Sequence, residues 1–219
     1  MGTVERIAIF IALLAFVVAG GSGFLYFEQQ KNNQPAELSQ QQVRTALAAH
    51  QADLTRYAGD PVLGNLDGAV TLVGFFDYNC TYCKAVHPDV MRLLESDPTL
   101  RYVAKEFPVL GPVSTFASQA ALASQKQNGY KAFNLALMKT RLAKKEQVLL
   151  IAKASGLDVD RLKSDMDTYK DEINATLDNT FALAKVLALK GTPAFIAGDR
   201  LVAGTPTLGG LKKLVDLAR

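Results

Sequence analysis

Two cysteines separated by two residues are the part of this sequence best suited to chemistry. They are Cys80 and Cys83, and the 219-residue chain contains no others. If Cys80 begins a helix, the free backbone N–H groups of the first turn and the helix dipole stabilise its thiolate. Cys83 then lies about one turn further on, close enough to form a disulfide. The spacing therefore predicts a redox pair in which Cys80 forms a mixed disulfide and Cys83 resolves it.

Other uses of the cysteine pair fit the sequence less well. A structural zinc site needs further ligands, but the chain has only two histidines and no second cysteine pair. One of the histidines, His87, is expected on the surface of the same helix rather than as a catalytic base. A purely structural disulfide in so small a loop would add little rigidity. We therefore expect no bound metal and no cofactor.

The overall composition is that of a folded globular protein. Hydrophobic residues make up 49% of the chain and charged residues 21%, which excludes a disordered chain. The formal net charge of +3 is too small to indicate a nucleic-acid partner, and no basic cluster stands out.

Strand and helix patterns surround the cysteines. Val70–Phe76 is a short apolar run typical of a strand buried on both faces, and it leads towards Cys80. Between about residues 112 and 190, apolar residues recur at helical spacing, and Gly191 is expected to follow the end of the last helix. The other expected elements are a helix over Lys84–Leu94, a strand over Arg101–Phe107, a hairpin of Gly191–Ile196 and Arg200–Ala203, and a final helix over Leu208–Ala218.

The N-terminal segment is long and apolar enough to enter a membrane. Ile7–Phe27 contains 21 residues without a charge, about 31 Å of helix and close to the thickness of a bilayer core. We expect residues 1–28 to form a transmembrane signal anchor, and the alternative is a signal peptide cleaved near Ala19–Gly23. Both interpretations place the rest of the chain across the membrane, where an oxidising compartment permits disulfide cycling.

Residues 29–58 connect this segment to the part that contains the cysteines. A polar tether is followed by Ser39-Gln-Gln-Gln42, the pattern of a capping box, so one helix is expected from Ser39 to about Tyr57. Its larger residues form a short heptad seam, which either packs on the chain's own domain or joins copies of the chain into a homo-oligomer. The seam residues are Val43, Leu47, His50, Leu54 and Tyr57.

Three sequence blocks resemble the DsbA family of thiol–disulfide oxidoreductases. Phe75–Lys84, which reads FFDYNCTYCK, is similar to the active-site segment of that family. Lys105–Pro112 and Gly191–Ile196 look like two blocks of its shorter, DsbG- and ScsC-like branch. The resemblance runs from about Gly64 to the C-terminus. It implies an α/β, thioredoxin-like fold for residues 59–219, with an inserted all-helical domain at about residues 112–190.

The resemblance also implies which residues surround the cysteines. Thr192–Pro193 would contain a cis peptide bond and lie against the cysteine pair, with the substrate backbone pairing beside it. Thr81 and Tyr82, between the cysteines, would support the active site and contact the substrate.

Two departures from the family pattern affect the expected chemistry. Gly74 stands where these proteins usually carry an acid that helps to deprotonate the buried thiol, and Glu106 on the neighbouring strand is a candidate substitute. The dipeptide Thr81-Tyr82 contains no histidine to pair with the Cys80 thiolate. We therefore expect a less oxidising reduction potential.

Together these features predict a thiol–disulfide oxidoreductase that acts on exported proteins. It would lie on the periplasmic side of the inner membrane, anchored by Ile7–Phe27, or in the soluble periplasm after signal cleavage. Its partners would be thiol-containing substrates and a DsbB-like or DsbD-like membrane redox protein. Two alternatives stay open: an oligomeric protein disulfide isomerase or reductase of the same fold, and a non-catalytic envelope module that binds a partner or carries Cu(I) on Cys80 and Cys83.

Overall fold

The computed structural model describes residues 38–219. Leu38–Arg219 form one compact unit, whereas the expected membrane segment Ile7–Phe27 and most of the polar tether lie outside the described residues. Within residues 38–219, no helix is both long enough and apolar enough to cross a membrane.

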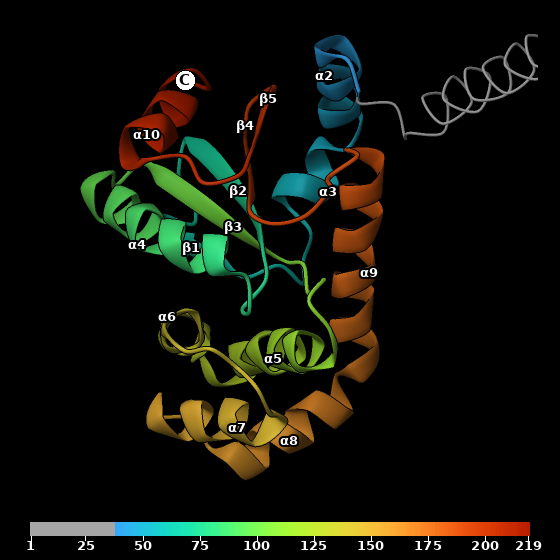
Figure 1. Cartoon of the computed structure of the whole chain (residues 1–219), viewed down its shortest axis with the longest axis vertical. Helices are drawn as coiled ribbons and strands as arrows, with labels where there is room; N and C mark the ends of the chain where they lie inside the picture. The colour runs from blue at the N-terminus through green and yellow to red at the C-terminus, as the bar shows by residue number, and fades with distance from the viewer. Residues whose placement is uncertain (1–37) are drawn as a thin grey trace, which may run out of the picture. The chain divides into compact units, whose positions relative to one another are not determined.

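A five-stranded mixed sheet forms the centre of this unit (Figure 1). The strand order is β1-β3-β2-β4-β5, in which β2 and β3 are parallel and all other neighbours are antiparallel. Strands from before and after the helical region therefore meet in one sheet. The strands are β1 (Val62–Gly64), β2 (Val70–Phe76), β3 (Leu100–Glu106), β4 (Ala194–Ala197) and β5 (Arg200–Ala203).

The central strands lie where their apolar runs predict them. β2 has the predicted bounds, and all of its residues except Thr71 are buried. β3 begins and ends one residue earlier than expected. The sequence interpretation missed β1, because Val62–Gly64 is very short and is followed by turn-forming residues. It becomes a strand through its antiparallel pairing with β3.

Helices cover both faces of the sheet (Figure 1). α4 and α10 share one apolar cluster with Leu72 of β2, and α2, α3 and α9 share a second cluster with Val73. Adjacent residues of β2 thus point to opposite faces, which explains why the strand is apolar throughout. These helices are α2 (Gln40–Ala49), α3 (Gln51–Thr55), α4 (Thr81–Ser96), α9 (Lys170–Val186) and α10 (Leu208–Asp216).

The segment between β3 and β4 is helical, as expected for residues 112–190. Its apolar residues, such as Phe133 and Leu137, join the same cluster as α4. The last helix, α9, ends at Val186, earlier than expected, and Ala188 rather than Gly191 takes a left-handed conformation after it (φ 52°). Besides α9, the segment contains α5 (Pro112–Ala123), the short 3-10 helix Ser124–Gln127, α6 (Tyr130–Lys139), α7 (Lys145–Ala154) and α8 (Val159–Thr168).

The segment expected as one helix from Ser39 to Tyr57 is in fact two. The capping box between Ser39 and Gln42 is present, but the helix breaks at His50, whose backbone is not helical (φ −112°, ψ 20°). Leu47 on α2 and Leu54 on α3 are both buried in the chain's own core, at 3% and 2% exposure. The seam therefore packs on its own domain, and these two leucines are not available to a second copy of the chain.

Candidate active site

The cysteine pair lies where β2 leads into α4. Cys80 is the N-cap residue of α4 and has an extended backbone (φ −73°, ψ 115°). Its sulfur accepts a hydrogen bond from the backbone N–H of Cys83 at 3.2 Å. A free N–H group of the first turn is thus directed at this sulfur, as the spacing predicted. The same bond strengthens when the acceptor is a charged thiolate.

The Thr192–Pro193 segment lies against the cysteine pair, although it is 112 residues away from Cys80 in sequence. The Cys80 thiol donates to the Thr192 carbonyl oxygen, with a sulfur–oxygen distance of 3.4 Å. The Thr192–Pro193 peptide bond is cis, as the resemblance implied. Thr81 and Tyr82 are exposed beside the cysteines, and Tyr82 has 67% of its surface accessible. The fold therefore brings the predicted site residues together.

The two thiols differ in their surroundings. Both are free, but Cys83 is 1% exposed whereas Cys80 is 5% exposed. Burial raises the pKa of Cys83 far above its ordinary value, and the hydrogen bond with Cys80 adds to this. Hydrogen bonds from the Thr192 side chain and the Asp77 backbone oppose the shift. Cys83 therefore holds its proton more firmly than an ordinary thiol, which suits a residue that reacts second.

Asp77 holds the turn that precedes the cysteines, a role that nothing in the sequence had indicated. Its side chain is fully buried. Oδ1 accepts from the Asn79 N–H at 2.7 Å and from the Ser114 hydroxyl at 2.8 Å, and Oδ2 accepts from the Leu110 N–H at 2.9 Å. One carboxylate thus joins the cysteine turn to the loop after β3 and to α5. Aspartate is common in turns, so only the fold reveals these distant partners.

Comparison with known proteins agrees with this geometry. A thioredoxin family model matches residues 55–217, which is most of the chain. The chain belongs to the thioredoxin family.

Solved structures similar to this thioredoxin-family chain are DsbA- and ScsC-like thiol–disulfide oxidoreductases. A thioredoxin-like oxidoreductase from Silicibacter pomeroyi DSS-3 is 42% identical, with a TM-score of 0.74 over 77% of this chain and 97% of its own. The thiol-disulfide exchange protein alpha-DsbA2 from Wolbachia pipientis is 28% identical, with a TM-score of 0.77 over 82% and 97%. The catalytic domain of Proteus mirabilis ScsC is 31% identical, with a TM-score of 0.67 over 80% and 97%. The DsbG/ScsC-like branch therefore fits this chain.

The curated relatives are much longer than this chain. The match to the Na(+)/H(+) antiporter NhaA 1 of Salinispora arenicola is 26% identical and covers 73% of this chain but 24% of the antiporter. The chain spans about a quarter of the length of the curated relatives it matches. The similarity therefore concerns one part of those proteins.

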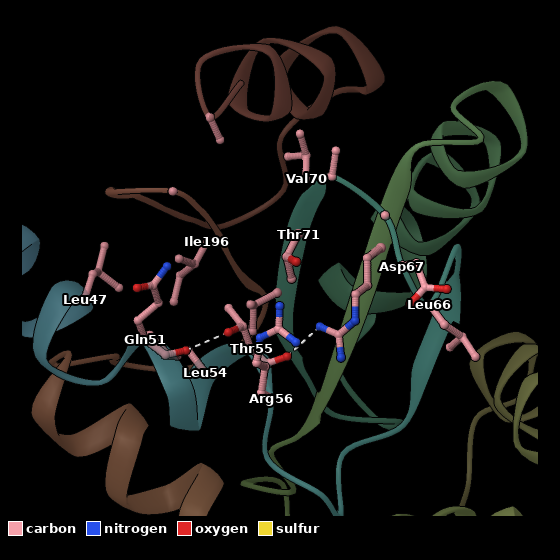
Figure 2. A pocket seen from close by; sticks show the side chains of 16 residues that line it. Leu47, Gln51, Leu54, Thr55, Arg56, Leu66, Asp67, Val70, Thr71 and Ile196 are labelled. Atoms are coloured by element: carbon pink, nitrogen blue, oxygen red, sulfur yellow. Dashed lines mark hydrogen bonds between the residues drawn. The ribbon is translucent and has the colours of Figure 1, made fainter.

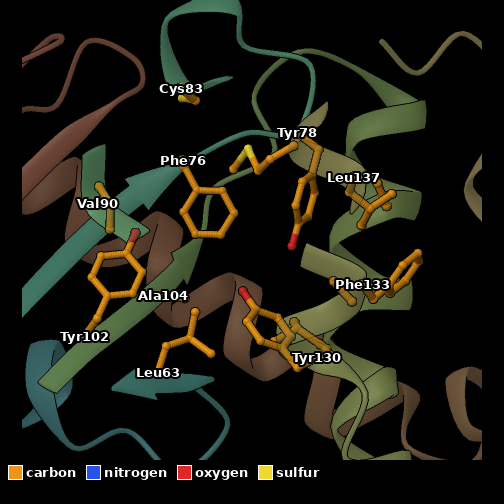
Figure 3. Close-up of a cluster of buried hydrophobic side chains, with 14 of the residues drawn as sticks. Leu63, Phe76, Tyr78, Cys83, Val90, Tyr102, Ala104, Tyr130, Phe133 and Leu137 are labelled. Carbon is orange, nitrogen blue, oxygen red and sulfur yellow. The ribbon is translucent and has the colours of Figure 1, made fainter. Parts of the chain in front are cut away.

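Glu106, at the end of β3, is a buried carboxyl group in this thioredoxin-family domain. The hydroxyls of Tyr78 and Tyr130 donate to Oε1 at 2.7 and 2.8 Å, and Ser118 donates to Oε2 at 2.7 Å. Figure 3 shows the Tyr78 and Tyr130 rings converging. Burial raises the pKa of Glu106 to about 8, although the three donors oppose the shift. The network joins the cysteine turn, which contains Tyr78, to α5 and α6 of the helical segment.

The space beside Gly74, where the family usually has an acid, is filled by Tyr102 of β3. A Cβ atom added to Gly74 would lie 2.3 Å from the Tyr102 hydroxyl oxygen, so no larger residue fits while Tyr102 keeps its position. Tyr102 is 4% exposed, and burial, followed by the nearby Cys83, raises its pKa. A phenol that the sequence interpretation did not single out therefore occupies this place, whereas Glu106 is held by other partners.

His87 is half-buried, which corrects the expectation of a helix-surface residue. Its Nε2 lies 3.0 Å from Oδ1 of Asn134 on α6, and burial lowers the His87 pKa. The pattern of α4 alone does not show that α6, which begins 43 residues after His87, covers this side of the helix. His87 therefore connects α4 to the helical segment.

Replacing Glu106 with glutamine should make stability less sensitive to pH. The folded-state pKa of about 8 lies above the value of about 4.3 for an unfolded chain. Between these values the folded state keeps a proton that the unfolded state has lost. The free energy of unfolding of the wild type should therefore fall as pH rises through this window, by up to about 1.4 kcal/mol per pH unit, and Glu106→Gln should remove that contribution.

Urea unfolding at about pH 5 and about pH 8 measures this difference. Burial also raises the pKa of Asp60, to about 6, so the wild type has a second contribution of the same sign. The comparison therefore uses the difference between wild type and Glu106→Gln, with the exposed Glu95→Gln as the matched control. Equal pH slopes in wild type and Glu106→Gln would contradict the raised pKa.

Proposed function

We propose that this chain catalyses thiol–disulfide exchange on exported proteins, with Cys80 forming the mixed disulfide and Cys83 resolving it. The observation that best supports these roles is the position of Cys80. It caps α4, accepts the Cys83 N–H, and contacts the Thr192 carbonyl. An anionic sulfur is stabilised at such a position. Cys83 is the more deeply buried of the two thiols.

The proposed reaction in the oxidising direction begins with the Cys80–Cys83 disulfide. A substrate thiolate attacks the Cys80 sulfur, the bond between the two cysteines breaks, and Cys83 leaves as a thiolate. The second substrate thiolate then attacks the substrate sulfur of the mixed disulfide and releases Cys80. Two electrons pass from the substrate dithiol to the cysteine pair. A DsbB-like membrane partner would remove them, whereas a DsbD-like partner would supply electrons for the reverse reaction.

The proposed substrate surface consists of Thr81, Tyr82 and Thr192, and the buried Pro193 supports it. Tyr82 is 67% exposed and presents an aromatic ring next to the reactive sulfur. Leu110, which is 53% exposed, adds an apolar side chain from the loop after β3. A surface of this kind suits an extended polypeptide with apolar side chains.

The proposed location is the periplasmic side of the inner membrane. It is supported by the uncharged stretch Ile7–Phe27, which is long enough for an anchor, and by the need of a cycling disulfide for an oxidising compartment. A soluble periplasmic protein released by signal cleavage is the alternative that sequencing of the mature N-terminus would identify.

Of the two alternative functions, the oligomeric isomerase finds less support in the fold. An oligomeric isomerase would need a contact surface other than the buried leucines of the Ser39–Tyr57 seam. Within the described part of the chain, no group of three or more His, Cys, Asp or Glu side chains could hold a metal ion. The Cu(I)-carrying alternative uses the two sulfurs of Cys80 and Cys83, so it stays open until Cu(I) binding is measured.

The reduction potential of the full chain should be lower than that of DsbA, which is about −120 mV. The dipeptide Thr81-Tyr82 has no histidine to stabilise the Cys80 thiolate, so the disulfide is a weaker oxidant. Equilibration in glutathione buffers, followed by alkylation of free thiols and mass spectrometry, measures the potential. Tyr82→His should raise it and Tyr82→Phe should not. A wild-type value at or above that of DsbA would show that another group stabilises the thiolate.

A further inference from the structure

A polar pocket lies at the opposite end of the sheet from the cysteines. It has a volume of about 420 Å³ and lies between α2–α3 and the beginnings of β2 and β3 (Figure 2). Val70, the first residue of β2, lines it, whereas Cys80 follows the last residue of that strand. The pocket and Cys80 therefore lie about 20 Å apart, which is roughly the length of β2. The volume is within the range of small-molecule sites.

Two arginines line this pocket. Arg101 on β3 donates from Nη1 to the Thr55 carbonyl oxygen at the end of α3, which holds its guanidinium in place. Arg56 follows Thr55 directly. Both side chains line the same pocket, and the charge of Arg56 adds to the burial that lowers the pKa of Arg101.

Asp60 attracts Arg101 but is itself paired with Lys105, so no carboxylate within residues 38–219 neutralises both arginines. Neither guanidinium forms an ion pair there, and the only side-chain hydrogen bond of the two is that of Arg101 to Thr55. Asp67 lines the same pocket, but it is exposed and pairs with neither arginine. Like charges held close together repel each other, and a bound anion would remove this repulsion.

The other lining groups favour an anion with several oxygens. Gln51 and Thr71 contribute an amide and a hydroxyl, and Leu54 and Val73 provide apolar walls. In Figure 2, Arg56 and Thr71 lie in the middle of the lining residues. One guanidinium group can donate to two phosphate oxygens at once. Two guanidinium groups and a hydroxyl therefore suit a phosphate group better than a carboxylate, which has only two oxygens.

We propose that this pocket binds a phosphate group, carried either by a free phosphate compound or by a phospholipid headgroup. Arg56 and Arg101 would donate paired N–H bonds to its oxygens, and the Thr71 hydroxyl would donate a further bond. The site shares no residue with the cysteine pair. It is therefore independent of the proposed exchange activity and goes beyond it.

Titration calorimetry of the full chain in a non-ionic detergent tests the proposal with two probes. Inorganic phosphate represents the free source, and micelles doped with phosphatidylglycerol represent the lipid source. Saturable binding of the first alone, of the second alone, or of both supports the proposal and identifies the source. Arg56→Gln should weaken the binding at least tenfold, because one of the two guanidinium groups is lost.

Arg56 is the primary variant because its exposed side chain makes no hydrogen bond in the described part of the chain. Arg101→Gln should have a similar effect but also removes the bond to Thr55, so its unfolding midpoint is measured first. Arg92→Gln, which removes an exposed arginine on α4, is the charge-matched control and should bind like the wild type. The proposal is overturned if neither probe binds saturably, or if Arg56→Gln and Arg92→Gln bind equally. Thiol exchange should be unchanged in Arg56→Gln, which separates this outcome from a failure of the proposed function.

Discussion

Replacing Cys83 with alanine should turn the protein into a trap for its substrates. The Cys80 thiolate would still attack a substrate disulfide and form a mixed disulfide while the other substrate sulfur leaves, but no neighbouring thiol could resolve it. Because the chain has no third cysteine, every trapped adduct must be attached to Cys80. Non-reducing electrophoresis of cell extracts should show adducts that disappear on reduction, and mass spectrometry should identify the linked peptides.

The reciprocal variant provides the control for this experiment. Cys80→Ala should reduce exchange activity to background and form no comparable adducts, because the remaining Cys83 thiol is 1% exposed and burial holds its pKa high. Cys80→Ala/Cys83→Ala should behave in the same way. Adducts of equal abundance in Cys80→Ala, or exchange activity that survives in it, would reverse the assigned roles. Cu(I) bound tightly by a wild type without exchange activity would favour the carrier alternative instead.

Replacing Lys105 with methionine should destabilise the fold by about 3–5 kcal/mol. The Lys105 side chain is fully buried and forms an ion pair with Asp60. Its Nζ also donates to the Asp53 carbonyl at 2.6 Å and to Asn179 Oδ1 at 3.2 Å, so it ties α3 and α9 to β3. Methionine would fill a similar volume but would leave the buried Asp60 carboxylate without its ion-pair partner. The other Asp60 oxygen, Oδ1, has no hydrogen-bond partner among residues 38–219.

A double variant separates the loss of charge pairing from the loss of packing. Asp60→Asn/Lys105→Met contains no unpaired buried charge and should recover most of the stability lost in the single variant. Burial raises the pKa of Asp60 to about 6 even beside Lys105, and removing the lysine raises it further. The single variant should therefore lose less stability at low pH, where Asp60 is protonated, than at neutral pH. Urea unfolding at both pH values measures these differences, and a neutral-pH loss below about 1 kcal/mol would show that the pair contributes little.

Elements whose signals are local were predictable from the sequence. The apolar run of β2, the capping box at Ser39, and the helical periodicity after Pro112 all depend on residues close together in the chain. The position of Cys80 and Cys83 at the start of a helix was predictable for the same reason, because consecutive residues form an N-cap and the first turn. These predictions held because local geometry depends on local sequence.

Elements whose signals come from a distant partner were not predictable. β1 is a strand because β3 pairs with it, and His87 is half-buried because α6 covers it. The helix after Ser39 breaks at His50, although the seam pattern continues through this residue. For β1 and His87, a contact between segments far apart in sequence outweighs the local preference.

The sequence by itself predicted a cysteine pair at a strand-to-helix junction and, through its resemblance to a known family, the fold around that pair. Only the tertiary structure decided what surrounds that pair. It placed the Thr192 carbonyl against Cys80, gave Asp77 its distant partners, and filled the space beside Gly74 with Tyr102. The physical reason is that the reactivity of a thiol depends on burial and on nearby dipoles and charges. These come from whichever segments the fold brings together, and the order of residues along one segment does not reveal them.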